Sequence, residues 1–163
     1  MNKKGFTLIE LLIVIAIIAI LAGVVFVSLD PLKRFQDARN ASRWTDVTAV
    51  LSAIKVNQVD NGGYYLWAVD NAAEDTNLQI SNATTTTACN TSCSTVITAA
   101  DDCVNLSGLV DAGVLAKLPV SPNGAGSWDG VRSGYYMSRN KNGSITVGAC
   151  DAEPAGEVIT VNR

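Results

Sequence analysis

The sequence predicts an α+β protein in which a long N-terminal helix packs with its C-terminal half on a small antiparallel β-sheet head. Three observations predict this architecture. An apolar run extends from Phe6 to Val27, an amphipathic pattern follows as far as Val59, and β-forming segments gather towards the C terminus of the 163 residues. This length leaves room for one head joined to the helix and not for two independent domains.

The apolar run is long enough to cross a membrane. Its 22 residues contain a single charge, Glu10. As a helix the run would measure roughly 33 Å, against a hydrocarbon core of about 30 Å, and a helix satisfies its own backbone hydrogen bonds. An ionised side chain in such a span costs about 2.5–3.5 kcal/mol, so Glu10 is expected to have a partner and a function.

A secretory signal peptide and a plain single-pass anchor are the alternatives for this segment. The apolar core of a signal peptide spans about 7–15 residues and ends at a small-residue cleavage site. The present run is longer, contains a carboxylate and is not followed by such a site. The obvious processing point instead precedes the run, within Met1–Gly5.

The segment Lys3-Lys4-Gly5-Phe6-Thr7-Leu8-Ile9-Glu10 resembles the class III signal of type IV pilins and pseudopilins. It combines a short basic leader, a glycine, an aromatic residue and a glutamate four residues further on. The resemblance implies cleavage between Gly5 and Phe6 by a membrane prepilin peptidase, followed by N-methylation of Phe6. It also implies that Glu10 registers subunits by pairing with the amine of Phe6 on a neighbour, which would make the buried charge tolerable.

The flanks of the apolar run suggest its orientation and where the helix ends. Lys3 and Lys4 favour a cytoplasmic leader and an outward head. Two basic residues beyond the run argue mildly the other way, so the orientation rests mainly on the resemblance. Gly23 and Pro31 are expected to break or kink the helix. Proline does so because it cannot donate the backbone hydrogen bond that a helix needs.

The helix beyond Pro31 is predicted to be amphipathic. It should run from Leu32 to about Val59, and Asp60-Asn61-Gly62-Gly63 should stop it. Its apolar stripe is predicted to pack on the sheet of the head and comprises Trp44, Val47, Val50, Leu51 and Ile54.

The head is predicted to combine a long polar loop with a C-terminal sheet. A short helix should end near Gly113, strands on either side of Asn140–Gly143 should form a hairpin, and Glu157–Val161 should add a third strand. The predicted segments are a leader (1–5), a transmembrane or filament-core helix (6–30), an amphipathic helix (31–61) and a head (62–163) with its loop at about 62–103 and its sheet at about 131–163.

Four cysteines predict two disulfides in an exported head. Three pairings are possible. Cys89–Cys93 with Cys103–Cys150 is favoured, because the second bond would join the first helix of the head to its sheet. A zinc site is disfavoured, since the sequence has neither a CxxC pair nor a histidine. No metal and no cofactor is predicted.

Enzyme chemistry is not predicted. A serine triad would lack its usual base because the chain has no histidine, and neither a P-loop nor a dinucleotide fingerprint is present. The acidic pairs Asp101–Asp102 and Asp151/Glu153 are better explained as solvated surface than as a calcium site. Residues 62–163 contain 10 acidic and 5 basic side chains, which disfavours nucleic-acid binding but leaves a local basic patch open.

The resemblance implies a structural subunit of a type IV pilus, a homopolymer assembled by the pilus machinery through the apolar helix. The precursor would be a single-pass protein of the cytoplasmic membrane with its N terminus inside, and the assembled pilus would be extracellular. The alternatives are a type II secretion or competence pseudopilin, and a minor pilin with an adhesive or DNA-binding head. The sequence does not distinguish motility, adhesion and DNA uptake.

Processing at the signal is directly testable. The mature chain should begin at N-methylated Phe6, because the residues around Gly5 match the peptidase signal. Intact-mass analysis of purified filaments measures this. Retention of Met1, or an unmethylated Phe6 in every molecule, would count heavily against the assignment.

Overall fold

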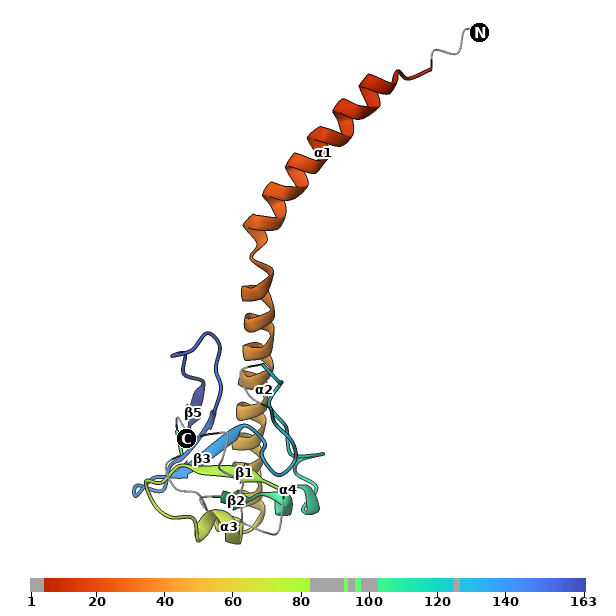
Figure 1. The fold of residues 1–163 in the computed structure, drawn as a ribbon. Coiled ribbons are helices and arrows are strands. Elements are labelled where there is room, and N and C mark those ends of the chain that lie inside the picture. The colour runs from red at the N-terminus through yellow and green to blue at the C-terminus, as the bar shows by residue number, and fades with distance from the viewer. Residues whose placement is uncertain (1–4, 83–92, 94–95, 98–102, 125–126) are drawn as a thin grey trace. The chain divides into compact units, whose positions relative to one another are not determined.

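The protein has an α+β architecture, seen here in a computed structural model that describes all residues except 1–4, 83–92, 94–95, 98–102 and 125–126. The chain divides into two compact units, Met1–Phe35 and Gln36–Arg163, which are described separately. The elements in chain order are α1 (Leu8–Leu29), α2 (Pro31–Asp60), α3 (Trp67–Asp70), β1 (Leu78–Ser81), β2 (Cys103–Asn105), α4 (Ser107–Asp111), β3 (Tyr135–Arg139), β4 (Ile145–Ala149) and β5 (Thr160–Asn162) (Figure 1).

The first unit contains α1 and the start of α2, which are separated at Asp30. Asp30 has a left-handed backbone (φ 40°) at the end of α1, and its Oδ1 accepts a hydrogen bond of 3.4 Å from the backbone N–H of Lys33. Pro31 takes the first position of α2, where its missing N–H is not needed. The interruption therefore lies immediately before Pro31. The expectation of a second break at Gly23 is wrong, because Gly23 lies inside the continuous helix α1 and one glycine costs a helix only about 1 kcal/mol.

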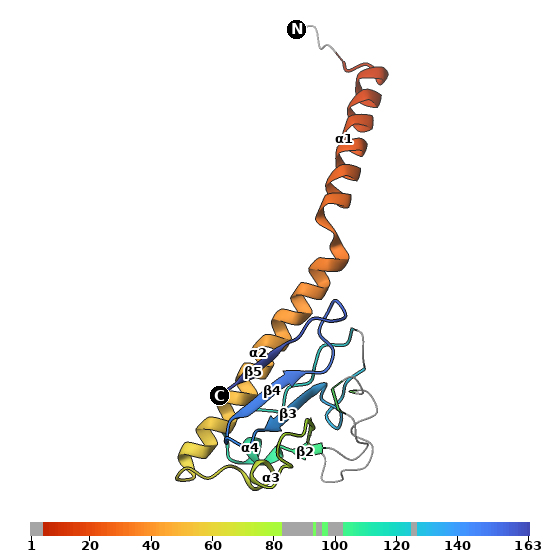
Figure 2. The same cartoon turned by 90° about the vertical axis from the view of Figure 1, so that its left-hand side faces the viewer.

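Among the described residues, the second unit is built on a five-stranded mixed sheet with strand order β2-β1-β3-β4-β5. Figure 2 shows β5, β4 and β3 side by side. The predicted hairpin is present as β3 and β4, which pair from Tyr135↔Ala149 to Arg139↔Ile145. Its turn uses Gly143 at φ 81°, a conformation that favours glycine. Strand β5 pairs antiparallel to β4 and overlaps the predicted third strand, Glu157–Val161, at its C-terminal end.

The predicted long loop is only partly a loop. Helix α3 and strand β1 both lie within residues 62–103, and β1 sits between β3 and β2 in the sheet. All four residues of β1 are buried. Its neighbour β2 pairs with it in parallel, so the expectation of a purely antiparallel sheet is also wrong. A four-residue strand whose partners are distant in sequence gives little local signal.

The main hydrophobic core lies between α2 and one face of the sheet. Side chains from α2 pack there with Ile80 of β1, Met137 of β3 and Val147 of β4. The predicted stripe is confirmed for four of its five residues, whereas Trp44 is 42% exposed. The four buried stripe residues are Val47, Val50, Leu51 and Ile54.

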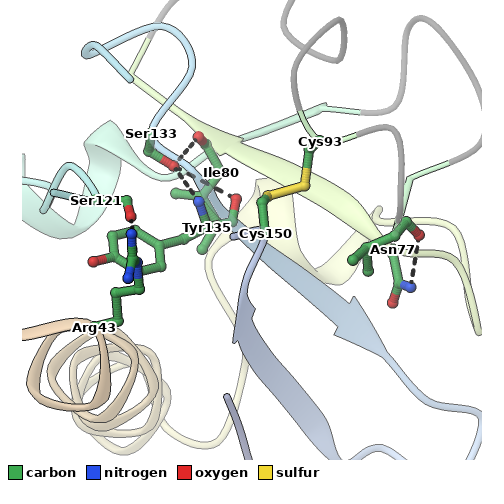
Figure 3. Close-up of a disulfide and its surroundings, with 9 residues drawn as sticks. Arg43, Asn77, Ile80, Cys93, Ser121, Ser133, Tyr135 and Cys150 are labelled. Carbon is green, nitrogen blue, oxygen red and sulfur yellow. Dashed lines mark hydrogen bonds between the residues drawn. A yellow bond between two sulfur atoms is a disulfide. The ribbon is translucent and has the colours of Figure 1, made fainter. Parts of the chain in front are cut away.

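Arg43 takes the buried place that Trp44 was expected to fill. It is fully buried (0% exposed) and four residues before Val47 on the same helix face. Its Nη1 donates to Glu153 Oε2 (3.0 Å), its Nε donates to Ser121 Oγ (3.1 Å), and its Nη2 donates to the carbonyl of Pro122 (3.1 Å). Figure 3 shows the bond between Arg43 and Ser121 beside Tyr135. A buried guanidinium is tolerable only with such partners.

Glu153 connects three residues of α2 to the segment after β4. Besides Arg43, its carboxylate pairs with Arg39 at 2.5 and 2.8 Å, and its backbone N–H and carbonyl both bond the side chain of Asn40. The Arg39 guanidinium, together with Arg43, holds the pKa of the Glu153 carboxyl below its ordinary value of 4.5. This cluster, which we call the Arg43–Glu153 clamp, fixes the segment after β4 to α2.

Neutralising the Glu153 carboxylate should destabilise the folded head. Glu153→Gln removes the carboxylate that is hydrogen-bonded to the buried Arg43 guanidinium, which should lower the free energy of unfolding by about 3–5 kcal/mol at neutral pH. Because the folded pKa of Glu153 is lowered, its contribution is present above about pH 4.5 and is lost as the pH falls through the folded pKa. The variant should therefore lose less stability than the wild type on acidification.

The measurement is urea unfolding of the full chain in detergent at neutral pH and well below pH 4.5. Glu157→Gln is the matched control, since Glu157 is exposed on the same segment and should change stability by no more than about 0.5 kcal/mol. Equal stability of the two variants at neutral pH would contradict the role of the clamp.

Candidate functional site

The predicted processing and registration residues lie at the start of the first unit. Gly5 and Phe6 precede α1 and are exposed, with Phe6 at 89%. Residues 1–4 of the predicted leader lie outside the described residues. The bond between Gly5 and Phe6 is therefore in an accessible stretch outside the helix, as cleavage by a peptidase requires.

Glu10 closes a capping box at the N terminus of α1. The backbone N–H and the hydroxyl of Thr7 donate to Glu10 Oε2 at 2.9 and 2.8 Å. In return, Thr7 Oγ1 accepts a bond of 3.3 Å from the backbone N–H of Glu10. Such boxes satisfy backbone donors that have no partner within the helix. Within a single chain, the carboxylate thus has a local partner in addition to any partner on another subunit.

Thr7 is a residue whose role the sequence analysis missed. The pattern Thr7-Leu8-Ile9-Glu10 is a Thr-x-x-Glu capping-box sequence before an apolar run, so the signal was present. The predicted partner of Glu10, the amine of Phe6 on a neighbour, belongs to another molecule and stays a prediction.

Apart from Glu10 and Ser28, the surface of α1 is apolar on every side. None of its 22 residues is buried, and large side chains such as Leu8 (81%) and Val27 (81%) are strongly exposed. By length and composition, the helix that begins at Leu8 could cross a membrane. An all-round apolar helix is stable only when lipid or other protein surrounds it.

The disulfide pairing favoured from the sequence is wrong. The structure joins Cys93 to Cys150, across 57 residues of sequence. Cys103 is also disulfide-bonded, and Cys89 lies outside the described residues. Figure 3 shows the Cys93–Cys150 bond beside the end of the sheet.

The strand order explains why Cys103 does not pair with Cys150. Cys103 lies in β2 and Cys150 follows β4, so β1 and β3 separate them. Three strand spacings amount to about 14 Å, whereas the Cα atoms of a disulfide lie within about 7 Å. The sequence could not exclude this pairing because it contained no sign of β1.

The disulfide holds part of the polar loop against the sheet of the head. Cys93 and Ile97 pack with Trp128, Tyr136 and Cys150 in a second, smaller hydrophobic cluster. Asn77 adds a side-chain bond of 3.1 Å to the carbonyl of Val96. The loop is therefore attached to the head through Cys93, Val96 and Ile97 by a covalent bond, a hydrogen bond and apolar burial.

The acidic pair Asp151/Glu153 does not form a cation site in the structure. Glu153 is committed to the Arg43–Glu153 clamp, and burial raises the pKa of the Asp151 carboxyl. Across the part of the chain that the structure describes, no group of three His, Cys, Asp or Glu side chains is placed to hold a metal ion. Asp101 and Asp102 lie outside that part.

Comparison with known proteins identifies the N-terminal segment. Residues 1–26 match the family model described as the prokaryotic N-terminal methylation motif. The chain is also 52% identical over 67 residues to the type IV wide pilus major component PilA4 of Thermus thermophilus. That match covers 39% of this chain and 47% of the relative, so the chain spans about half the length of the curated relative.

No solved structure matches the chain. The family model covers the segment that contains Gly5, Phe6 and Glu10, and the geometry places these residues at the accessible start of an all-round apolar helix. The predicted resemblance is thereby confirmed: the chain has the prokaryotic N-terminal methylation motif and is similar to a type IV pilin.

Proposed function

We propose that this protein is the structural subunit of a type IV pilus, which polymerises through α1 after cleavage between Gly5 and Phe6. The observation that carries the proposal is that α1 is apolar on every side and has no buried residue in the single chain. The similarity to a major pilus component favours a pilin over a pseudopilin or a minor pilin.

The surface of α1 suits two successive environments. Before assembly it would lie in the cytoplasmic membrane, with the basic leader inside and the head outside. After assembly the same surface would be covered by the helices of neighbouring subunits. Apolar burial is non-directional and contributes about 1.5–3 kcal/mol for each fully buried Leu or Ile side chain, so it supplies strength without fixing a register.

Glu10 would fix the register of neighbouring subunits. Both hydrogen bonds from Thr7 end on Oε2, which leaves Oε1 outside the capping box. An amine released at Phe6 of a neighbour would meet this second oxygen without breaking the box. A charge pair of this kind forms only at short distance and in one arrangement, so it can fix the register. Apolar contacts are non-directional and cannot.

The variant Glu10→Val separates this proposal from a simple membrane anchor. In an anchor, removing the only charge of the span should be neutral or improve insertion. In a filament, the amine of Phe6 would be left buried and unpaired, at a cost of roughly 3–5 kcal/mol at every subunit contact. Assembly should fail while membrane insertion and leader cleavage persist.

The measurement compares the protein in membrane and sheared-filament fractions. Ile9→Val is the matched control, because it trims the preceding apolar residue and keeps the charge. If Glu10→Val gave a normal filament yield at equal membrane levels, Glu10 would not be needed to register neighbouring subunits, and the proposal would be wrong. The amount of wild-type protein in the sheared fraction separates the alternatives: abundant for a pilin, trace for a minor pilin, absent for a pseudopilin.

A further inference from the structure

A groove of about 560 Å³ lies on the head between α3 and β2, the outermost of the described strands on that side of the sheet. Figures 1 and 2 both show α3 and β2 at the same end of the head. Its walls are mainly apolar and include Leu66, Trp67, Ala72 and Val104. Small-ligand sites in proteins have this size and this mainly apolar lining.

Trp67 is the unusual residue of this groove. Its side chain belongs to the four-residue helix α3 and is 78% exposed, although tryptophan is among the residues that gain most from burial. Within the same unit Trp128 is only 7% exposed. An indole left open at the wall of a groove provides a flat apolar surface for a ligand.

The polar groups that the structure describes in the lining of the groove are uncharged. They include the side-chain amides of Asn71 and Asn105 and the hydroxyl of Ser107. Asn105 Oδ1 accepts a hydrogen bond of 2.8 Å from the backbone N–H of Ser107, which fixes the orientation of this amide. The described residues that line the groove include no Asp, Glu, Lys or Arg, although residues 62–163 contain 15 charged side chains.

These features select the chemistry of the ligand. The absence of a charge in the described lining disfavours phosphates, carboxylates and amines, because a charged ligand would lose hydration without gaining a counterion. A pyranose ring has an apolar C–H face and an edge of hydroxyl groups. The first matches the indole of Trp67, and the second matches amide and hydroxyl groups that can both donate and accept hydrogen bonds.

We propose that the groove between α3 and β2 binds a neutral saccharide, with one ring stacked on Trp67 and its hydroxyls bonded to Asn71, Asn105 and Ser107. The site lies entirely within the head, so this inference does not depend on the proposed role of α1. It gives the head a binding function, whether or not the chain forms filaments.

The test uses the full chain in a detergent without a sugar headgroup, so that the detergent does not compete. The probes are the neutral N-acetylglucosamine tetrasaccharide and maltotetraose, with trigalacturonate as a charged saccharide and an apolar hexapeptide as a non-sugar ligand. Binding is measured by saturation-transfer NMR and titration calorimetry. At least one neutral saccharide should bind more tightly than trigalacturonate and the peptide.

The variants test the stacking residue. Trp67→Ala should weaken saccharide binding about tenfold, as expected for loss of one aromatic stacking partner, and Trp67→Phe should restore most of it. Tyr64→Ala is the matched control, because Tyr64 is similarly exposed (76%) three residues earlier and does not line the groove. Failure of every neutral saccharide to bind, preference for the peptide or for trigalacturonate, or equal binding by Trp67→Ala would overturn the proposal.

Discussion

A charge removed from water must be paired, and this requirement governs how the head is held together. In the head, the fully buried Arg43 is paired with Glu153, and their shared partners fix the segment after β4 to α2. In the first unit, Glu10 is exposed in the single chain and bonded to Thr7. The first charge is satisfied when the chain folds. Under the proposed function, the second is satisfied when the chain assembles.

The two helices differ in the surfaces that they present. Helix α1 is apolar on every side and buries none of its residues, whereas α2 buries one stripe against the sheet. The change of pattern falls at Asp30 and Pro31, where the backbone also departs from helical geometry. One sequence thus provides a segment suited to lipid or helix neighbours and a segment suited to a water-exposed head.

The sequence predicted the features that depend on local pattern. The apolar run, the stripe Val47–Ile54 and the Asn-Gly hairpin all have short-range signals, and the structure contains each of them. The features it missed depend on residues far apart in the chain. Strand β1 is defined by its pairing with β3 and β2. The counterion that makes the burial of Arg43 tolerable, Glu153, lies 110 residues later. Cys103 cannot pair with Cys150 because two strands of the sheet separate them, and Cys150 is bonded to Cys93 instead.

A side-chain-resolution reconstruction of the native filament by electron cryomicroscopy tests whether Glu10 registers neighbouring subunits. We expect α1 to lie at the filament axis and the amine of Phe6 to lie within about 4 Å of the Glu10 carboxylate of a neighbouring subunit, the usual limit for an ion pair. A filament in which Glu10 contacts only Thr7 of its own chain and faces solvent would contradict this expectation. So would a filament in which α1 is not covered by neighbouring helices.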